Sequence, residues 1–339
     1  MNRILVVLPN WFGETLFATP FLRSLREQQP GCFIATLGWP SCREVLLHNS
    51  DVNLLLDYDE QGTHRTLRGK WRLINELRSH RFDTAFILRK SLSRSLLLRL
   101  SGIPERIGFD NPKSGWLLSR RVAVPRGPLH KAATYFPLLA AAGLSTPAVP
   151  VGYYAVSDEE RQAARERLGP VNAKPVAILH PGANWPHKRW APERFAALGD
   201  RLALAGAHVV ITGAPEDGPL ADTITQRMRQ RASVLAGQTS LRELGACLEQ
   251  ARLVVSNDTG ILHIAAALGR PLVALYGPTS PALTGPLGDA RRMAVLHHPD
   301  CCPQIPCYHP RHPSHPGMDA ISVEEVYAAA ARLLDASSS

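Results

Sequence analysis

The sequence predicts an α/β protein built from two doubly wound, Rossmann-like domains. Its length of 339 residues suits two domains of about 150 residues each. Short apolar runs alternate with amphipathic stretches along the chain, and one interruption containing Pro and Gly, residues 142–150, divides that alternation. We expect residues 1–150 to form the first domain and residues 151–339 the second, with the last helix as a candidate to pack back toward the first domain.

The first half of the sequence predicts a repeated strand–helix pattern. Residues 3–8 form an apolar run that predicts a strand buried on both faces, and a loop leads from it to an amphipathic helix at residues 14–28. Further strands are predicted at residues 33–37, 52–56, 84–88 and 106–109, with helices at residues 41–48, 67–79 and 93–100. Parallel strands joined by right-handed helical crossovers give a sheet covered on both faces.

The second half resumes the pattern. Strands are predicted at residues 175–179, 208–212, 253–256 and 271–276, and helices at residues 192–204, 220–231, 241–250 and 260–268. Residues 277–316 are rich in loop formers, and Ser322 with Glu325 gives a capping-box pattern that opens a last helix. Because open α/β sheets bind ligands beyond the carboxyl ends of their strands, we expect the two domains to face each other across a cleft.

Composition places the chain among soluble globular proteins, with 45% hydrophobic and 20% charged residues. No apolar run reaches the roughly 18 residues of a membrane span, and the first residues lack a signal-peptide pattern, so we expect a cytoplasmic protein. The six cysteines do not resemble the framework of a small secreted domain and are expected to be reduced.

The net charge of +9 is unevenly distributed. Residues 1–150 hold 20 Lys and Arg against 11 Asp and Glu, whereas residues 151–339 hold 18 of each kind. A basic domain beside a neutral one indicates that the first domain faces an anionic partner. Low aromatic content, 6%, and the lack of a basic stripe interleaved with aromatics argue against nucleic acid as that partner.

One candidate anion site lies where a strand of the second half meets its helix. Asp258, Thr259 and Gly260 occupy this junction, where backbone N–H groups and the positive end of the helix dipole favour phosphate. His263 lies one turn later and can face the same ligand. The alternative is simple capping of the helix by Asn257 or Asp258.

Two further loops of the second half carry candidate residues. Gly182 permits a ligand to approach closely, and Lys188 offers a cation for the charge that develops on a leaving phosphate, although it could equally be a solvated surface charge. Glu216 and Asp217 follow the next strand, where a carboxylate can accept hydrogen bonds from ribose hydroxyls. Their alternative role is that of an acidic helix start.

Glu14 is the candidate general base of the first half. It follows the first strand, and a carboxylate there can take a proton from a hydroxyl nucleophile; its alternative role is a plain acidic residue of a first helical turn. Basic residues that could contact an anionic acceptor are Arg89, Lys90, Lys113 and Arg120.

Two patterns could indicate a metal. Asp57 and Asp59 match the Asp-x-Asp pattern of metal-dependent sugar transferases, but so short a pattern arises easily by chance. A second cluster combines thiols with imidazoles of a His-Pro-x repeat: Cys301, Cys302, Cys307, His309, His312 and His315. Its spacing matches no standard structural zinc site. We therefore predict neither a metal nor a cofactor.

Five strings together carry a resemblance to a known family. They are PNWFGETLFATP at 9–20, KRWAPERF at 188–195, LAGQTSLREL at 235–244, VVSNDTGILHIAAAL at 254–268 and LYGPTSP at 275–281. With them the chain resembles the ADP-heptose:lipopolysaccharide heptosyltransferases of glycosyltransferase family 9 over nearly its whole length. The Pro-Asn-Trp opening and the region Ser114-Gly-Trp-Leu117 favour the heptosyltransferase II branch.

The resemblance implies a GT-B fold and a metal-independent, inverting transfer of heptose from ADP-heptose to an anionic lipopolysaccharide precursor. It matches Lys188 to a lysine on the donor phosphate, residues 258–260 and His263 to the diphosphate-binding segment, and Asp217 to an acid near the ribose. Glu14 falls where the family usually has Asp, so its carboxylate is displaced by about a bond length, and misplacement on the order of 1 Å can cost around a hundredfold in rate.

The basic charge of the first domain suits such an acceptor and could also hold the protein at the inner face of the cytoplasmic membrane. Two alternatives stay open. One is a family 9 enzyme with a different sugar donor or acceptor. The other is a nonenzymatic binder of nucleotide sugars or nucleic acid.

Overall fold

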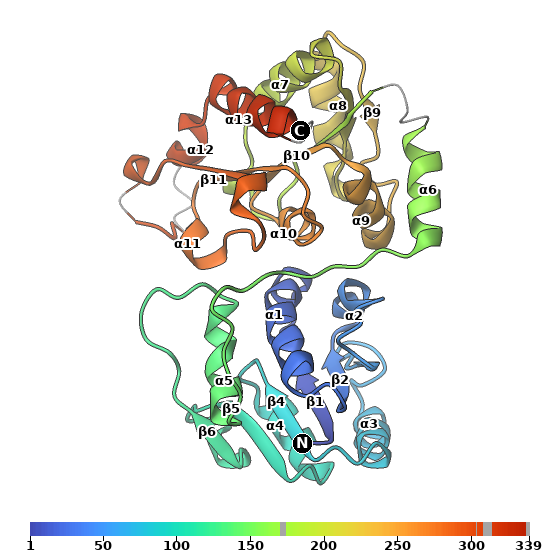
Figure 1. The fold of residues 1–339 in the computed structure, drawn as a ribbon, viewed down its shortest axis with the longest axis vertical. Helices are drawn as coiled ribbons and strands as arrows, with labels where there is room; N and C mark the ends of the chain where they lie inside the picture. The colour runs from blue at the N-terminus through green and yellow to red at the C-terminus, as the bar shows by residue number, and fades with distance from the viewer. Residues whose placement is uncertain (170–173, 303, 308–313, 337–339) are drawn as a thin grey trace. The chain divides into compact units, whose positions relative to one another are not determined.

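The computed structural model describes residues 1–169, 174–302, 304–307 and 314–336. The chain divides into two compact units, Met1–Ala155 and Val156–Ser339, so the division falls shortly after the linker expected at residues 142–150 (Figure 1). Each unit contains a six-stranded, wholly parallel sheet with helical crossovers. The predicted fold class is confirmed.

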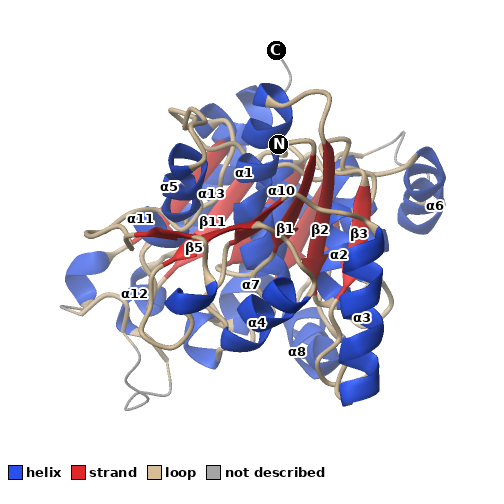
Figure 2. Cartoon of the chain, turned by 90° about the horizontal axis from the view of Figure 1, so that it is seen from below, coloured by secondary structure: helices blue, strands red, loops and turns tan. Residues whose placement is uncertain are grey.

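The sheet of the first unit has the strand order β3-β2-β1-β4-β5-β6. β1, β2 and β3 run side by side in Figure 2. The strands are β1 (Arg3–Val7), β2 (Phe33–Gly38), β3 (Leu54–Asp57), β4 (Thr84–Ile87), β5 (Glu105–Phe109) and β6 (Arg120–Val122). The helices are α1 (Phe12–Gln28), α2 (Pro40–Leu46), α3 (Leu67–Ser79), α4 (Leu92–Leu100) and α5 (Phe136–Ala141).

The sheet of the second unit has the order β12-β11-β10-β7-β8-β9. The strands are β7 (Val176–His180), β8 (His208–Ile211), β9 (Ser233–Val234), β10 (Leu253–Asn257), β11 (Leu272–Tyr276) and β12 (Met293–His297). The longer helices are α6 (Asp158–Leu168), α7 (Pro192–Leu204), α8 (Gly218–Arg227), α9 (Leu241–Gln250), α10 (Gly260–Ala267) and α13 (Val323–Ala336), and the short ones are α11 (Pro281–Thr284) and α12 (Pro316–Ala320).

The central strands form because their apolar runs can be buried on both faces. In β1, Ile4, Leu5, Val6 and Val7 are all fully buried, and the strands β7, β10 and β11 of the second unit are buried along their whole length. Helices then cover the sheets with single apolar faces. α3 and α4, for example, contribute Leu73, Leu77 and Leu98 to one core beneath the first sheet.

In each sheet the strand order reverses at one point. This point lies between β1 and β4 in the first unit and between β7 and β10 in the second. The loops that follow these strands therefore leave the sheet in opposite directions, and such a switch point is where doubly wound sheets bind ligands. The topology thus selects the loops after β1, β4, β7 and β10.

Elements with weak apolar patterns were not predicted. β6 and β9 are short edge strands, and β12 lies inside the region expected to be loop-rich. α6 is polar along most of its length and is held instead by a capping box at Ser157 and by Arg242, which pairs with Glu160. In the predicted capping box of the last helix, Glu325 N–H donates to Ser322 Oγ at 3.1 Å, while the Glu325 carboxylate contacts His298 Nε2 at 3.0 Å.

Candidate functional site

The buried carboxylate of Asp258 is the centre of a polar cluster at the switch point of the second sheet. Lys188 Nζ donates to Asp258 Oδ2 at 2.6 Å, and Thr279 Oγ1 donates to the same oxygen at 2.6 Å. His263 Nε2 lies 4.0 Å from the other oxygen. Asp258 is only 6% exposed, whereas the Lys188 side chain is 22% exposed. Three loops, after β7, β10 and β11, thereby meet at one carboxylate.

The N-terminus of α10 opens beside this cluster. Its N-cap residue, Thr259, makes no side-chain hydrogen bond to the helix among the described residues. The side chains of Asn257 and Asp258 do not cap the helix either, because they are engaged with other loops. Backbone N–H groups in the first turn of α10, which begins at Gly260, and the positive end of its dipole remain suited to an anion.

Asn257 fixes the loop after β7 against the end of β10. It is fully buried, its Nδ2 donates to Pro181 O at 2.8 Å, and its Oδ1 accepts the Trp190 N–H at 3.2 Å. Trp190 is itself buried and donates through Nε1 to Ile321 O at 2.9 Å. Lys188 is therefore held between two anchored points of its loop.

Asp217 belongs to a second, adjoining group of contacts. Its Oδ2 accepts the Ala214 N–H at 3.0 Å, and its Oδ1 lies 3.3 Å from Arg189 Nη2. A Cβ on residue 182 would stand 2.1 Å from Asp217 Oδ2, so Gly182 is required by this carboxylate. Asp217 is buried and engaged with the protein, whereas Glu216 is exposed.

His180 lies at the end of β7 beneath these loops. Its Nδ1 contacts Thr212 Oγ1 at 2.9 Å, and burial lowers its pKa from 6.5 to about 4. The ring is therefore neutral near pH 7. For Tyr276, burial and secondarily the charge of Asp258 raise the pKa well above its ordinary value. Positive charge in this cluster thus comes from Lys188 and Arg189 and not from His180.

In the first unit, Glu14 lies in the first turn of α1, directly after β1. Its Oε1 is 3.0 Å from Lys131 Nζ, and both side chains are partly exposed. Burial, and secondarily the charge of Glu14, raise the pKa of the neighbouring Tyr135 above its ordinary value. Glu14 is thus a partly exposed carboxylate that pairs with Lys131.

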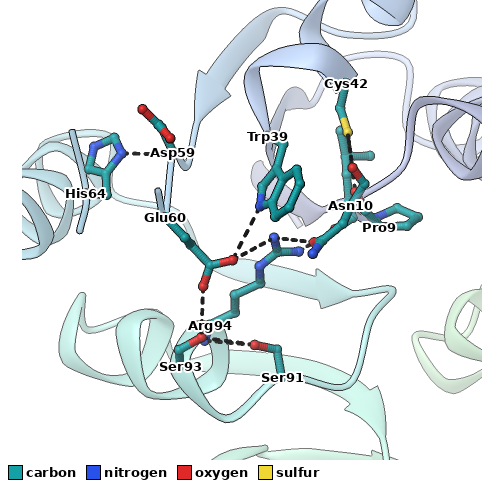
Figure 3. A network of polar contacts seen from close by, with 11 residues as sticks. Pro9, Asn10, Trp39, Cys42, Asp59, Glu60, His64, Ser91, Ser93 and Arg94 are labelled. Carbon is teal, nitrogen blue, oxygen red and sulfur yellow. Dashed lines mark hydrogen bonds and ion pairs between the residues drawn. The ribbon is translucent and has the colours of Figure 1, made fainter. Parts of the chain in front are cut away.

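The loop that leads into α1, and so to Glu14, is held by a buried guanidinium. Arg94 is 1% exposed; its Nη1 donates to Leu8 O at 2.7 Å, and its Nη2 donates to Asn10 Oδ1 at 2.6 Å (Figure 3). Cys42 Sγ contacts the carbonyls of Pro9 and Asn10 from the other side. Burial lowers the pKa of Arg94 below its ordinary value.

Glu60 completes this network. Its Oε2 lies 3.4 Å from Arg94 Nη2 and accepts a hydrogen bond from Trp39 Nε1 at 3.3 Å, while its Oε1 accepts one from Ser93 Oγ at 3.3 Å (Figure 3). A buried cation needs such compensation. The network joins the loops after β1, β2, β3 and β4 at the carboxyl edge of the first sheet.

The predicted acceptor-binding residues do not all lie together. Arg89 and Lys90 are exposed and follow β4 at the switch point, and Lys113 is exposed after β5. Arg120 instead begins β6; its Nη2 lies 2.8 Å from Glu105 Oε1, and its Nη1 donates to Ala141 O. Arg120 is thus engaged near the amino end of β5, away from Arg89 and Lys90.

The two acids of the Asp-x-Asp pattern are engaged by other parts of the first unit. Asp59 accepts the N–H groups of Gly62 at 2.8 Å and Thr63 at 3.0 Å, and these bonds lower its pKa. Asp57 lies 3.7 Å from Arg43 Nη1. The two carboxylates have separate local partners.

The Cys–His cluster is brought together in part. Potential ligand atoms of Cys302, Cys307 and His315 all lie within 4.8 Å of one another, whereas His309 and His312 lie outside the described residues. His315 Nδ1, however, accepts the Gly317 N–H at 3.1 Å as the cap of α12. A neutral imidazole has one unprotonated nitrogen, so this cap competes with metal coordination.

Sequence reasoning missed several residues of these clusters. Thr279 lies within a string that carries the family resemblance, but it has no recognisable chemistry of its own. Arg94 had a usable signal, because it falls on the face of α4 that also buries Leu97 and Leu98. Lys131 and Arg189 could not be distinguished from surface charges, since their partners are distant in sequence.

Comparison with known proteins adds independent evidence. The model of glycosyltransferase family 9 (heptosyltransferase) matches residues 70–309. Lipopolysaccharide heptosyltransferase 2 of Escherichia coli (strain K12) is 28% identical over 306 residues, which cover 87% of this chain and 88% of that protein. Lipooligosaccharide heptosyltransferase 2 of Haemophilus influenzae is 29% identical over 299 residues, covering 84% and 86%.

Solved structures of two such proteins are also similar to this chain. The structure of E. coli ADP-heptose lipopolysaccharide heptosyltransferase II has a TM-score of 0.84 at 26% identity and covers 99% of this chain and 100% of that one. The glycosyl transferase family 9 protein from Veillonella parvula DSM 2008 has a TM-score of 0.88 at 25% identity, with 99% and 98% covered.

Replacing Asn257 should destabilise the second unit. Asn257→Ala leaves Pro181 O and the Trp190 N–H without their buried partner, and each unsatisfied group costs about 1–3 kcal/mol. Urea denaturation followed by circular dichroism measures the loss, and Asn75→Ala on the exposed face of α3 is the control. Equal unfolding midpoints for both variants would contradict the assigned role of Asn257.

We expect the purified protein to carry no stoichiometric zinc, because the α12 cap occupies a ring nitrogen of His315. Dialysis against a chelator followed by elemental analysis tests this, with a Cys302→Ser/Cys307→Ser variant as the control. One zinc per chain that survives dialysis and is lost in the variant would show that coordination displaces the cap.

Proposed function

Because the chain belongs to glycosyltransferase family 9, we propose that it transfers heptose from ADP-heptose to an anionic inner-core lipopolysaccharide precursor, as a heptosyltransferase II-like enzyme. Transfer would proceed with inversion at the sugar and without a metal. The observation that carries this proposal is the cluster of Lys188, Asp258 and Thr279 beside the uncapped N-terminus of α10.

The cluster is suited to a departing diphosphate. Lys188 supplies the mobile cation, and Asp258 orients it through a 2.6 Å contact while Thr279 shares the same oxygen. As the bond from the anomeric carbon to ADP breaks, negative charge grows on the phosphate oxygens. Lys188 and the N–H groups of Thr259 and Gly260 would stabilise that charge most strongly in the transition state.

The residues around the cluster would shape the remainder of the donor site. His263, whose Nε2 lies 4.0 Å from Asp258 Oδ1, would contact the diphosphate. Gly182 would act through the shape of the loop after β7, because Asp217 Oδ2 occupies the space that a side chain at residue 182 would take. Of the two candidate ribose acids, Glu216 is the exposed one, and Asp217 would act through the shape of the loop that it holds.

Glu14 would act as the general base. Its carboxylate would take the proton of the acceptor hydroxyl as that oxygen attacks the anomeric carbon from the face opposite ADP, which gives inversion, as in inverting glycoside hydrolysis. Lys131 would keep the side chain oriented at 3.0 Å. Glu in place of the usual Asp extends the base by one methylene, so the acceptor hydroxyl would lie correspondingly further from α1.

The basic charge of residues 1–150 suits an anionic acceptor, and Arg89, Lys90 and Lys113 are the exposed cations that would contact it. None of the helices in the described part of the chain is both long and apolar enough to cross a bilayer. From the basic charge of the first unit, we propose a cytoplasmic enzyme that meets its lipid-linked acceptor at the inner face of the cytoplasmic membrane.

A second candidate is a family 9 transferase with another sugar donor or acceptor. The second-unit cluster recognises diphosphate and ribose features, which all ADP-sugars share, so it discriminates poorly among sugars. Glu14 stands where the family usually has Asp, and this difference favours another acceptor more than another sugar donor.

Mass spectrometry of purified acceptors incubated with ADP-heptose tests the proposed reaction. We expect a gain of one heptose on an inner-core precursor and release of ADP only when that acceptor is present. Transfer of another sugar would favour the second candidate, whereas no acceptor-dependent release of ADP would contradict a transferase.

Lys188→Ala should lower kcat by a factor on the order of 10² to 10³, because it removes one preorganised donor to the developing charge. Lys174→Ala, an exposed lysine just before β7, is the matched control and should leave kcat unchanged. A Lys188→Ala enzyme within about threefold of wild type would exclude Lys188 from the transition state.

Glu14→Gln should lower kcat by a factor on the order of 10² to 10⁴ with unchanged affinity for ADP, because only proton removal is lost. Glu14→Asp should keep part of the activity, since it retains the carboxylate and shifts it by about a bond length. Steady-state kinetics and ADP titration calorimetry separate these effects. Full activity in Glu14→Gln would remove the proposed base.

A further inference from the structure

α4 exposes a stripe of leucines on its outer face. Leu92, Leu96 and Leu100 follow one another at four-residue intervals and are 48%, 41% and 42% exposed. The opposite face of α4 is buried through Leu97 and Leu98. The outward face of a surface helix is ordinarily polar, so this stripe is not explained by the core of the first unit.

α3 extends the apolar surface alongside this stripe. Leu67 is 77% exposed and Trp71, one turn later, is 51% exposed. Arg78 joins the two helices, because its guanidinium lies 5.8 Å from the Trp71 ring and its Nη2 donates to Leu100 O at 2.8 Å. We call the exposed side chains of Leu67, Trp71, Leu92, Leu96 and Leu100 the α3–α4 patch.

Exposed basic residues lie on the same two helices and on the segment that leads into α4. They are Arg68, Arg72 and Arg78 on α3, Arg89 and Lys90 before α4, and Arg99 near its end. Glu76 is the exposed acid within α3. Aromatic and aliphatic side chains accompanied by Arg and Lys are typical of surfaces that lie in the interfacial region of anionic bilayers.

We propose that the α3–α4 patch docks the protein on an anionic lipid surface, with the apolar side chains entering the interfacial region and these basic residues contacting lipid phosphates. This inference rests on the proposed function, because a lipid-linked acceptor places the substrate at such a surface. Arg89 and Lys90 lie both on the segment that leads into α4 and at the switch point where the acceptor would bind. The lipid anchor and the saccharide of one acceptor would thus be engaged by adjoining surfaces.

Charge favours a membrane over a second copy of the chain. A symmetric dimer through the α3–α4 patch would place the exposed arginines of these helices in both copies near each other, which is unfavourable without compensating acids. A bilayer rich in phosphatidylglycerol supplies negative charge across the whole patch.

Sedimentation with vesicles tests the proposal. The wild-type protein should bind vesicles that contain phosphatidylglycerol, bind phosphatidylcholine vesicles weakly, and dissociate from the former in about 0.5 M salt. Leu96→Gln/Leu100→Gln should weaken binding to anionic vesicles by on the order of tenfold, because two side chains no longer enter the interface. Leu204→Gln, on a leucine of α7 that is 73% exposed, is the matched control and should bind as wild type does.

Three results would overturn the docking surface: no binding of wild type to anionic vesicles, equal binding by Leu96→Gln/Leu100→Gln, or a wild-type dimer in light scattering that this variant dissociates. Heptose transfer to a delipidated, water-soluble acceptor should be unchanged in the variant. Transfer without vesicle binding would refute the docking surface alone, whereas vesicle binding without transfer would refute the proposed function alone.

Discussion

The second unit depends on one electrostatic constraint, the burial of the Asp258 carboxylate. A charge that is 6% exposed must be compensated, and Lys188 and Thr279 provide this compensation from loops that follow two other strands. The same contacts fix a cation beside an uncapped helix terminus. The requirement to satisfy one acid therefore fixes the positive charge that we propose acts on the departing diphosphate.

The first unit solves a similar problem with the opposite charge. Arg94 is buried beside the end of β1 and is satisfied by Leu8 O, Asn10 and Glu60. In each sheet a buried charge thus lies where the strand order reverses. Asp258 holds Lys188, and Arg94 holds the loop that leads into α1 and Glu14. Arg94 would influence the position of Glu14 without touching substrate, because it binds the loop that precedes α1.

The sequence was sufficient for most of the architecture because the central strands are uniformly apolar. β1, β7, β10 and β11 appear as unmistakable buried runs, whereas β9 has two residues and α6 is almost wholly polar, so neither leaves a periodic signal. Their positions are decided by pairing with β8 and by the ion pair between Arg242 and Glu160, which are tertiary effects.

The same distinction applies to the candidate site. Asp258, Gly260 and Lys188 could be predicted because a strand–helix junction and parallel strands place them by topology. The alternative role of Asn257 as a helix cap could not be rejected without knowing that its amide is used by Pro181 and Trp190. Arg120 shows the converse, since a cation that suited an anionic partner is engaged by Glu105 and Ala141 instead.

The close approach of Gly182 to Asp217 has an evolutionary consequence. No side chain fits at residue 182 while that carboxylate keeps its place, because even a methyl group would overlap Oδ2. Substitutions at these two positions should therefore be coupled: a side chain can be added at residue 182 only where a smaller residue replaces Asp217. The pair should appear in related sequences as a correlated exchange, although more than thirty residues separate the two positions along the chain.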